Sequence, residues 1–333
     1  MSALSAGSTF GRNRQSVAAV VVTHNRLEKL RETVARLLDE DLDHVLVFDN
    51  ASTDGTADYL QALSDPRLHI ARSEDNLGGA GGFSNGLRQV VENFDPDWVV
   101  VMDDDGRPNP GMIAHFRKTA PGGWDAFGAA VLTPDGDVCE MNRPYRNPFW
   151  RRAEFFRTLM GGGRSGFHLD NAAYRPDAGI VEVDMTSFVG FFLSRNAIRR
   201  AGFPDPRLFI YGDDQLYALE MRRKGLRIGF LPDVTFEHDT TSIAEGEKLV
   251  LRPLWKVYYM YRNALIAYRV AAGPLFWPLL PVLAAKWRMQ DGRYGEDGPR
   301  YRMILREAMR DGLARKLDRP HADIVALSER PLT

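Results

Sequence analysis

The sequence predicts an α/β protein with a mostly parallel sheet in three layers and a helical C-terminal region rich in aromatic and basic residues. Along residues 17–105, short apolar runs alternate with segments whose apolar residues recur at helical spacing. The apolar runs are continuous, as in strands that are buried on both faces of a sheet. Polar residues follow these runs, at the strand ends where open α/β sheets place their ligands.

Composition bounds the class of protein. The 333 residues are 44% hydrophobic and 26% charged, which fits a globular chain with a substantial core in one or two domains. The net charge of −1 gives no global field that would favour nucleic acid as a partner. A single cysteine, Cys139, excludes an internal disulfide and fits a reducing compartment. Residues 1–15 lack the apolar segment of a secretory signal, and we expect a flexible arm there.

The order of the elements follows from the same patterns. In the first half we expect strands at 17–23, 44–48, 68–72 and 98–102, a helix at 27–40, a helix ending near 63, and a glycine-rich turn at 76–82 that opens a helix ending near 94. This βαβαβαβ order predicts parallel strands joined by right-handed crossovers. In the second half we expect an edge strand at 125–132, a strand with a central glycine within 180–193, and two short strands at 227–231 and 234–238.

The fourth strand runs directly into three carboxylates, Asp103, Asp104 and Asp105. Three adjacent acids repel one another and stay ionised at low cost only near a positive charge, most simply a divalent cation. An oxygen-rich site with open positions suits Mg²⁺ or Mn²⁺ that holds a diphosphate. The alternative is a solvated acidic turn before Gly106.

Three segments of this half resemble the nucleotide-binding half of an inverting family 2 glycosyltransferase with the GT-A fold. These segments are VTHNR at 22–26, DNASTDGT at 49–56 and DDD at 103–105. The turn NLGGAGGF at 76–83 is similar to that of galactofuranosyltransferases of actinobacterial cell-wall assembly. The resemblance extends over roughly 17–265. A dinucleotide-binding fold matches less well, because its glycine fingerprint should follow the first strand.

The resemblance implies a metal site made of Asp103, Asp105 and His238. Neutral imidazole beside two carboxylates is a sound ligand set for Mn²⁺ or Mg²⁺. Strand alternation would place Asp103 and Asp105 on one side and Asp104 on the other, so we assign Asp104 to the ribose or to supporting hydrogen bonds. A lone histidine in a strand is otherwise usually structural.

The resemblance also implies the contacts to the nucleotide. Arg26 and Asp49 would contact uracil, Asn76 would lie beside it, and Thr23 would line the pocket. The alternatives are local, since asparagine at 76 suits a turn and Asp49 suits the cap of the turn that follows it.

Asp213 and Asp214 begin a helix that we expect to stop at Gly225. Acids in a first helical turn are common for structural reasons. The resemblance instead implies a catalytic pair, with Asp214 as the base. Family members often carry another acid about two residues later, whereas this chain has QLY at 215–217.

Two further features have open interpretations. The irregular segment 141–176 contains seven arginines and is either an acceptor-side lid that contacts phosphates or a solvated basic loop. Phe191 or Phe192 is either an apolar face for a sugar ring or part of the core.

Residues 249–290 contain no acid and mix basic residues with tryptophan and tyrosine, which suits the headgroup zone of an anionic membrane. The uncharged run 270–285 is shorter than the ~20 residues of a membrane span and contains three prolines. We therefore expect a peripheral position on the cytoplasmic leaflet; the alternative is a helical cap on the catalytic domain. The predicted domains are a GT-A domain at 16–248, with a nucleotide half (16–124) and an acceptor half (125–248), and a membrane-associating region at 249–333.

Together these features predict a metal-dependent inverting glycosyltransferase. Its best donor is UDP-galactofuranose, and its acceptor is a glycan that is polyprenyl-linked or at the cell surface. One alternative keeps the fold with another donor, such as dTDP-rhamnose or a UDP-hexose. More distant alternatives are a nucleotidyltransferase, which should carry a glycine-rich and basic turn after its first strand, and a non-catalytic protein that binds sugar nucleotides.

Overall fold

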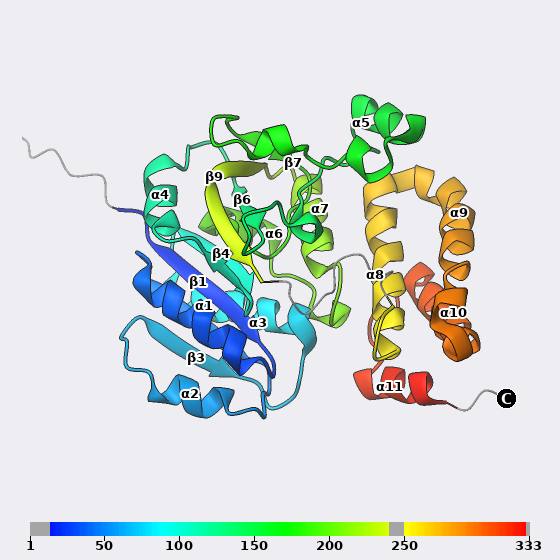
Figure 1. The fold of residues 1–333 in the computed structure, drawn as a ribbon, viewed down its shortest axis with the longest axis horizontal. Coiled ribbons are helices and arrows are strands. Elements are labelled where there is room, and N and C mark those ends of the chain that lie inside the picture. Colours follow the sequence, from blue (N-terminus) through cyan, green and yellow to red (C-terminus); the bar gives the residue numbers. More distant parts are fainter. Residues whose placement is uncertain (1–13, 240–249, 331–333) are drawn as a thin grey trace, which may run out of the picture.

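The computed structural model describes residues 14–239 and 250–330 (Figure 1). A nine-stranded sheet flanked by helices forms the larger part, and a group of helices from the C-terminal quarter stands beside it. The predicted arm at 1–15 lies largely outside the described residues, and the predicted domain boundary after residue 248 lies outside them entirely.

The first half of the sheet has the predicted parallel order β3-β2-β1-β4. Its strands are β1 (Val17–Thr23), β2 (His44–Asp49), β3 (Leu68–Arg72) and β4 (Trp98–Asp103). They are joined by α1 (Leu27–Asp39), α2 (Thr56–Ala62) and α3 (Gly78–Phe94). Alternate residues of β1 enter two different cores, one shared with α1 and the other with α3. The prediction of three layers around doubly buried strands is therefore confirmed.

The second half of the sheet is mixed. Its elements are β5 (Gly106–Pro108), α4 (Met112–Thr119), β6 (Ala126–Leu132), α5 (Arg152–Arg157), β7 (Val181–Val183), β8 (Phe191–Ser194), α6 (Arg195–Ala201), α7 (Asp213–Arg223) and β9 (Ile228–His238). Strand β8 runs antiparallel between β4 and β6 and thereby joins the two halves.

Three predictions for these strands are wrong. Strand β6 is interior, because β8 pairs with one of its sides and β9 with the other. Residues 180–193 form two strands, since the chain leaves the sheet after β7 and returns through Gly190, whose φ is +71°. The two short strands expected at 227–238 are one strand, β9, with a register shift that skips Pro232, which has no N–H to donate.

The C-terminal region consists of α8 (Trp255–Ala272), α9 (Phe276–Arg288), α10 (Gly298–Leu313) and α11 (His321–Glu329). Helix α8 packs between α7 and α10, and its tyrosines Tyr258, Tyr259 and Tyr261 are buried in a shared core. By length and composition alone, the stretch Trp255–Arg288 could cross a membrane. Gly273, with φ +55° and ψ −128°, ends α8 within that stretch, and α9 turns back beside α8 (Figure 1).

Candidate active site

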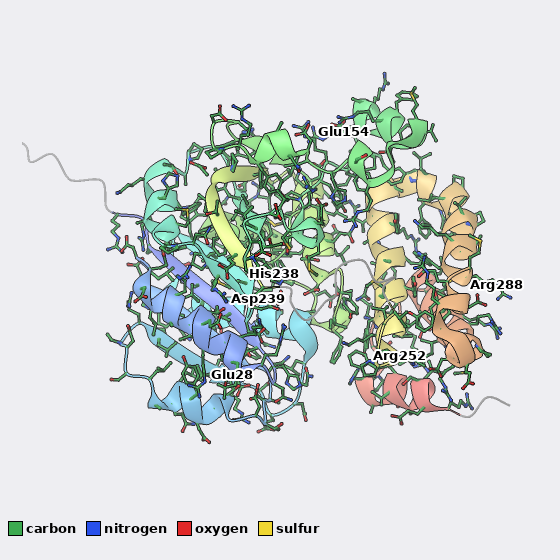
Figure 2. All side chains as sticks on the ribbon, viewed as in Figure 1. Glu28, Glu154, His238, Asp239, Arg252 and Arg288 are labelled. Carbon is green, nitrogen blue, oxygen red and sulfur yellow. The ribbon has the colours of Figure 1, made fainter. Side chains whose placement is uncertain are left out.

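The ends of β1, β4 and β9 meet at one edge of the sheet, which is where parallel strands place their ligands. Figure 2 shows His238, at the end of β9, near the centre of the molecule. Two adjoining cavities of about 390 Å³ and 720 Å³ open at this edge and share Arg26, Asp103 and Tyr211. The smaller cavity is lined by Asp103, Asp105, Asp213, Asp214 and His238, and the larger by Thr23, Arg26, Asn76, Asp103 and Asp104, among others.

The acidic triplet divides between these cavities. Strand β4 ends at Asp103, so the next two acids lie in the turn toward β5. Asp105 lines the smaller cavity, where its Oδ1 lies 3.2 Å from His238 Nε2. Asp104 is buried beside the larger cavity and accepts hydrogen bonds from Thr23 Oγ1 at 2.8 Å and from Arg26 Nη1 at 3.2 Å. Asp103 lines both cavities.

Arg26 balances part of the charge of the triplet. Its Nη1 lies 2.8 Å from Asp105 Oδ2 and 3.2 Å from Asp104 Oδ1. The guanidinium therefore faces the carboxylates in this structure, and its contact with uracil stays a prediction.

The pKa values of the triplet diverge because their surroundings differ. Burial and the adjacent Asp105 carboxylate raise the pKa of Asp103 to about 7. Burial also raises the pKa of Asp104 to about 6, although Arg26 opposes this. Burial alone would raise the pKa of Asp105, but His238 and Arg26 stabilise the carboxylate and hold its pKa below the usual range. Burial would lower the pKa of His238, yet its hydrogen bond to Asp105 outweighs this and raises the pKa to about 10.

Asn142 orients the His238 ring. The His238 Nδ1 lies 2.7 Å from Asn142 Oδ1, an atom that can only accept, so the Nδ1–H donates and Nε2 faces Asp105. Asn142 Nδ2 in turn donates to Ser187 Oγ at 2.9 Å. Outer partners of this kind fix the orientation of histidine ligands in metal sites. Sequence reasoning missed Asn142, since nothing local marks it within the irregular segment.

The side chains at this edge of the sheet are suitable ligands for a divalent cation. Among the described residues, the Asp103 carboxylate makes no hydrogen bond or ion pair, so its charge is balanced by no direct partner. Two carboxylates and an imidazole match the preferences of Mn²⁺, and Mg²⁺ is satisfied by carboxylates with water. Within the same described ranges, 14–239 and 250–330, no three such side chains already stand in metal-binding geometry. The metal site of Asp103, Asp105 and His238 stays a prediction.

The acidic pair begins α7, as predicted, directly after Gly212 with φ +73°. Burial raises the pKa of Asp214 to about 6, against the stabilising hydrogen bond that its Oδ1 accepts from the Gln215 N–H at 2.6 Å. Burial and the charge of Asp214 raise the pKa of Asp213 well above its ordinary value. The Gln215 side chain donates to Tyr145 Oη, away from the pair.

On the nucleotide side, local hydrogen bonds organise the predicted residues. Asp49 is buried and accepts the N–H of Ser52 at 2.9 Å. This hydrogen bond caps the turn that follows Asp49, which was the alternative to a contact with uracil. Its neighbour Asn50 lines the larger cavity and donates to Asn76 Oδ1 at 3.1 Å. Asn76 Oδ1 also accepts the N–H of Gly78 at 2.8 Å. Asn50 was missed, although its place at the end of β2 is a signal that could have found it.

The arginines of segment 141–176 are largely engaged within the protein. Arg143 pairs with Glu140 and Arg151 with Asp184. Other pairs in or near the segment are Arg146–Glu154, Arg157–Glu154 and Arg175–Asp177. These contacts favour a structural role for most of these arginines, and the lid stays a prediction.

Phe191 and Phe192 are fully buried, and Phe192 stacks on Phe116 with ring centroids 3.9 Å apart. The interpretation of either ring as an exposed face for a sugar is therefore wrong. Phe83 and Phe188 line the smaller cavity instead. Local sequence could not separate these rings, because the chain leaves the sheet between 184 and 190.

The chain is similar in sequence to proteins of known function. The sequence profile of glycosyl transferase family 2 matches residues 18–176. The galactofuranosyltransferase GlfT1 of Mycobacterium tuberculosis is 30% identical over 234 residues, which are 68% of this chain and 71% of the relative. GlfT1 of Mycolicibacterium smegmatis is 29% identical over 67% of this chain and 70% of its own. An undecaprenyl-phosphate mannosyltransferase of Micrococcus luteus is 29% identical over 48% of this chain and 67% of its own.

Two solved structures share the fold. GalNAc-T7 with UDP, GalNAc and Mn²⁺ superposes with a TM-score of 0.54 over 96% of this chain, which spans 54% of that protein, at 13% identity. The mannosyltransferase PcManGT from Pyrobaculum calidifontis, in complex with GDP-Man and Mn²⁺, superposes with a TM-score of 0.50 over 96% of this chain and 80% of its own, at 17% identity. Likenesses at such identities establish the fold alone.

Proposed function

Because the chain belongs to glycosyl transferase family 2 and is a glycosyltransferase, we propose that it transfers galactofuranose from UDP-galactofuranose with inversion at the anomeric carbon. The acceptor is a lipid-linked or cell-surface glycan. The observation that carries the mechanism is that the acids of β4 and those of α7 line one cavity. The donor sugar follows from the names of the two GlfT1 relatives.

The larger cavity is proposed to hold the nucleotide. Thr23, Arg26, Asn76 and Asp104 line it, and Asp49 braces the turn beside it. For Arg26 to reach the base, its guanidinium would have to leave Asp104 and Asp105. A cation near the triplet would make that exchange favourable, since it would replace the positive charge that Arg26 supplies.

Asp103, Asp105 and His238 are proposed to hold Mn²⁺ or Mg²⁺. When bound there, the ion would supply positive charge that stabilises the departing diphosphate. The two solved structures with the same fold contain Mn²⁺ together with a nucleotide or nucleotide sugar, which supports this assignment.

Asp214 is proposed to take the proton from the acceptor hydroxyl. Two adjacent buried carboxylates do not both ionise readily, and the pKa of Asp213 is raised further than that of Asp214. Asp213 therefore keeps the shared proton and Asp214 is the ionised member. A base with a pKa near 6 is ionised at neutral pH and still accepts a proton in the transition state.

A peripheral position on the cytoplasmic leaflet is proposed from one exposed surface. Leu275, in the turn before α9, lines a cavity together with residues of α5, and Figure 1 shows α5 beside the turn that joins α8 to α9. The large apolar side chains exposed on or beside these helices are Trp150, Phe156, Leu159, Met160, Leu275, Trp277, Val282 and Met289. Exposed basic residues lie on the same helices, Arg152 on α5 and Lys286 and Arg288 in the last turn of α9, where Figure 2 labels Arg288. An apolar surface with a basic fringe suits anionic lipid, and the name of the Micrococcus relative points to a lipid-linked acceptor.

A donor panel tests the proposal. The full chain is incubated with Mn²⁺, a lipid-linked acceptor, and UDP-galactofuranose, UDP-galactopyranose, UDP-glucose or dTDP-rhamnose, and both nucleotide release and glycan mass are measured. Turnover restricted to UDP-galactofuranose is expected. Turnover of a different donor would overturn the assigned sugar.

A further inference from the structure

The loop that leads into the catalytic pair has an unfavourable backbone. Phe209 has φ +67° and ψ −63°, and Tyr211 has φ +68°. Residues with large side chains rarely adopt positive φ, and such conformations persist where the surrounding structure holds them. Gly212 and Asp213 follow at once, so the shape of this loop sets where α7 begins.

Helix α8 holds the loop from the side of the C-terminal region. Asn263 Nδ2 lies 3.0 Å from the carbonyl oxygen of Leu208, 2.9 Å from that of Ile210 and 2.8 Å from that of Tyr211. Asn263 and Leu208 are almost fully buried, whereas Ile210 and Tyr211 are half-buried. The two N–H donors of one amide group thus lie within hydrogen-bond distance of three carbonyl oxygens of the loop.

Arg262, the residue before it on α8, fixes the direction of that amide. Arg262 Nε donates to Asn263 Oδ1 at 2.9 Å, which leaves Nδ2 facing the loop. Its Nη2 donates to the carbonyl oxygens of Arg207 and Leu208 at 2.9 Å and 3.0 Å. Arg262 is fully buried, and its charge faces the rings of Tyr258 and Tyr259.

The opposite side of the loop rests on the nucleotide half. The Phe209 carbonyl oxygen accepts the N–H of Ala80, in the first turn of α3, at 3.1 Å. The Phe209 ring stacks on Tyr259 of α8 and His321 of α11, with centroids 4.8 Å and 4.1 Å apart. The loop is therefore fixed between α3 and the C-terminal helices, while Ile210 and Tyr211 line both cavities.

We propose that Asn263 and Arg262 are positioning residues, which act through the loop 207–212 to place Asp214 against the acceptor hydroxyl. The C-terminal helical region then completes the active site in addition to any role at a membrane. This inference rests on the proposed role of Asp214 as the base. A merely structural role for Asn263 would stabilise the helices without directing the base.

The test replaces Asn263 with aspartate or alanine. Asn263→Asp keeps the shape of the side chain but removes both N–H donors, and Asn263→Ala removes the whole group. The matched control is Tyr261→Phe, which removes a hydroxyl on the same helix α8 that donates to Gln290 Oε1 at 2.9 Å but leaves the loop contacts in place. For each variant we would measure Tm, kcat, KM for the donor, and hydrogen–deuterium exchange of residues 206–214.

Both Asn263 variants are expected to lower kcat by about 100-fold, the cost of a small displacement of a catalytic group, with a much smaller change in KM. Hydrogen–deuterium exchange of the backbone amides of residues 206–214 should rise in both Asn263 variants. Tyr261→Phe should lower Tm while kcat and loop exchange keep their wild-type values. The inference is overturned if the Asn263 variants match Tyr261→Phe in kcat and in loop exchange.

The exchange measurement separates this inference from the proposed function. If the wild-type chain transfers no sugar but Asn263→Asp still raises the exchange of the loop amides, the proposed function fails and the role of Asn263 in holding the loop is upheld. If the wild-type chain is active and Asn263→Asp leaves the exchange of the loop amides unchanged, Asn263 does not hold the loop and the proposed function stands.

Discussion

The acids at the end of β4 and the acids at the start of α7 line the same cavity, but their charges are balanced in different ways. Arg26 and His238 stand within ion-pair distance of Asp105, and Arg26 also reaches Asp104. In the described parts of the chain, neither Asp213 nor Asp214 has an ion pair, and the side-chain partner of Asp214 is a backbone N–H. Asp104 and Asp105 thus stand beside cationic side chains, whereas the described residues provide no such partner for the acids of α7.

This difference separates two chemical tasks. Among the β4 acids, His238 and Arg26 hold the pKa of Asp105 below its usual range, so this carboxylate remains ionised, whereas burial raises the pKa of Asp103 to about 7 and that of Asp104 to about 6. Carboxylates that are desolvated without a cation have raised pKa values, which suits the exchange of a proton near neutral pH. The following predictions test this division, from the largest expected effect to the smallest.

Removing the base should have the largest effect. Asp214→Asn keeps the size of the side chain but cannot accept the proton, so kcat should fall by about 10²- to 10⁴-fold. Binding of UDP, measured by calorimetry, should be unchanged because the donor is held by the other acids. Asp177→Asn, an exposed acid paired with Arg175, is the matched control. Equal turnover in the two variants would remove Asp214 from the mechanism.

Loosening the His238 ring should weaken the metal site alone. Asn142→Ala removes the acceptor of the Nδ1–H, and loss of such an outer partner lowers metal affinity by about 10- to 100-fold. The readout is the Mn²⁺ concentration that gives half-maximal turnover. Asn109→Ala is the control, since Asn109 donates to Thr235 on the same strand β9 but away from the site. An unchanged Mn²⁺ requirement would argue against His238 as a ligand.

The dependence of activity on pH should follow the ionisation of the acidic pair at the start of α7. Because the pKa of Asp214 is raised to about 6 and the base works when deprotonated, activity should be present above pH 6 and decline below it. The decline is about tenfold per pH unit once Asp214 is mostly protonated. The measurement uses saturating Mn²⁺, which keeps the β4 acids ionised. A decline that begins only near pH 4 would contradict the desolvated environment of Asp214.

The smallest effect concerns how the β4 acids are stabilised. Thr23→Val removes the hydroxyl that donates to the Asp104 carboxylate, and Thr33→Val removes one that donates to the Asp104 backbone carbonyl, both at 2.8 Å. At neutral pH the first should lower the free energy of unfolding by about 1.5–3 kcal/mol and the second by about 0.5–1.5 kcal/mol. Equal losses in urea unfolding would show that Asp104 carries no charge there.

The sequence allowed the β4 half to be predicted because its signals are local. The continuous apolar runs and helical spacing of residues 17–105 specify each element, and the parallel order follows from the alternation of strands and helices. The triplet is contiguous, so its position at a strand end could be foreseen. His238 was placed beside it by resemblance to a family, and the structure brings it to within 3.2 Å of Asp105.

The rest could not be predicted because its contacts join distant segments. Strand β8 pairs with β4 and β6, and no periodicity within β6 distinguishes an edge position from an interior one. Asn142 reaches His238 across 96 residues, and Asn263 reaches Leu208 across 55. An amide that binds a distant carbonyl or imidazole leaves no pattern in its own neighbourhood.

The loop 207–212 approaches α3 so closely that it limits which residues can occupy position 78, which is Gly78 in this chain. A β-carbon there would lie 2.1 Å from the Phe209 carbonyl oxygen, whereas one on Gly79 would meet no atom within 4 Å. If each of the two positions is replaced by all other residues and the variants are sorted by whether they fold, Gly78 should tolerate no substitution and Gly79 should tolerate many. A missing methyl group is thus what allows the two halves of this enzyme to touch.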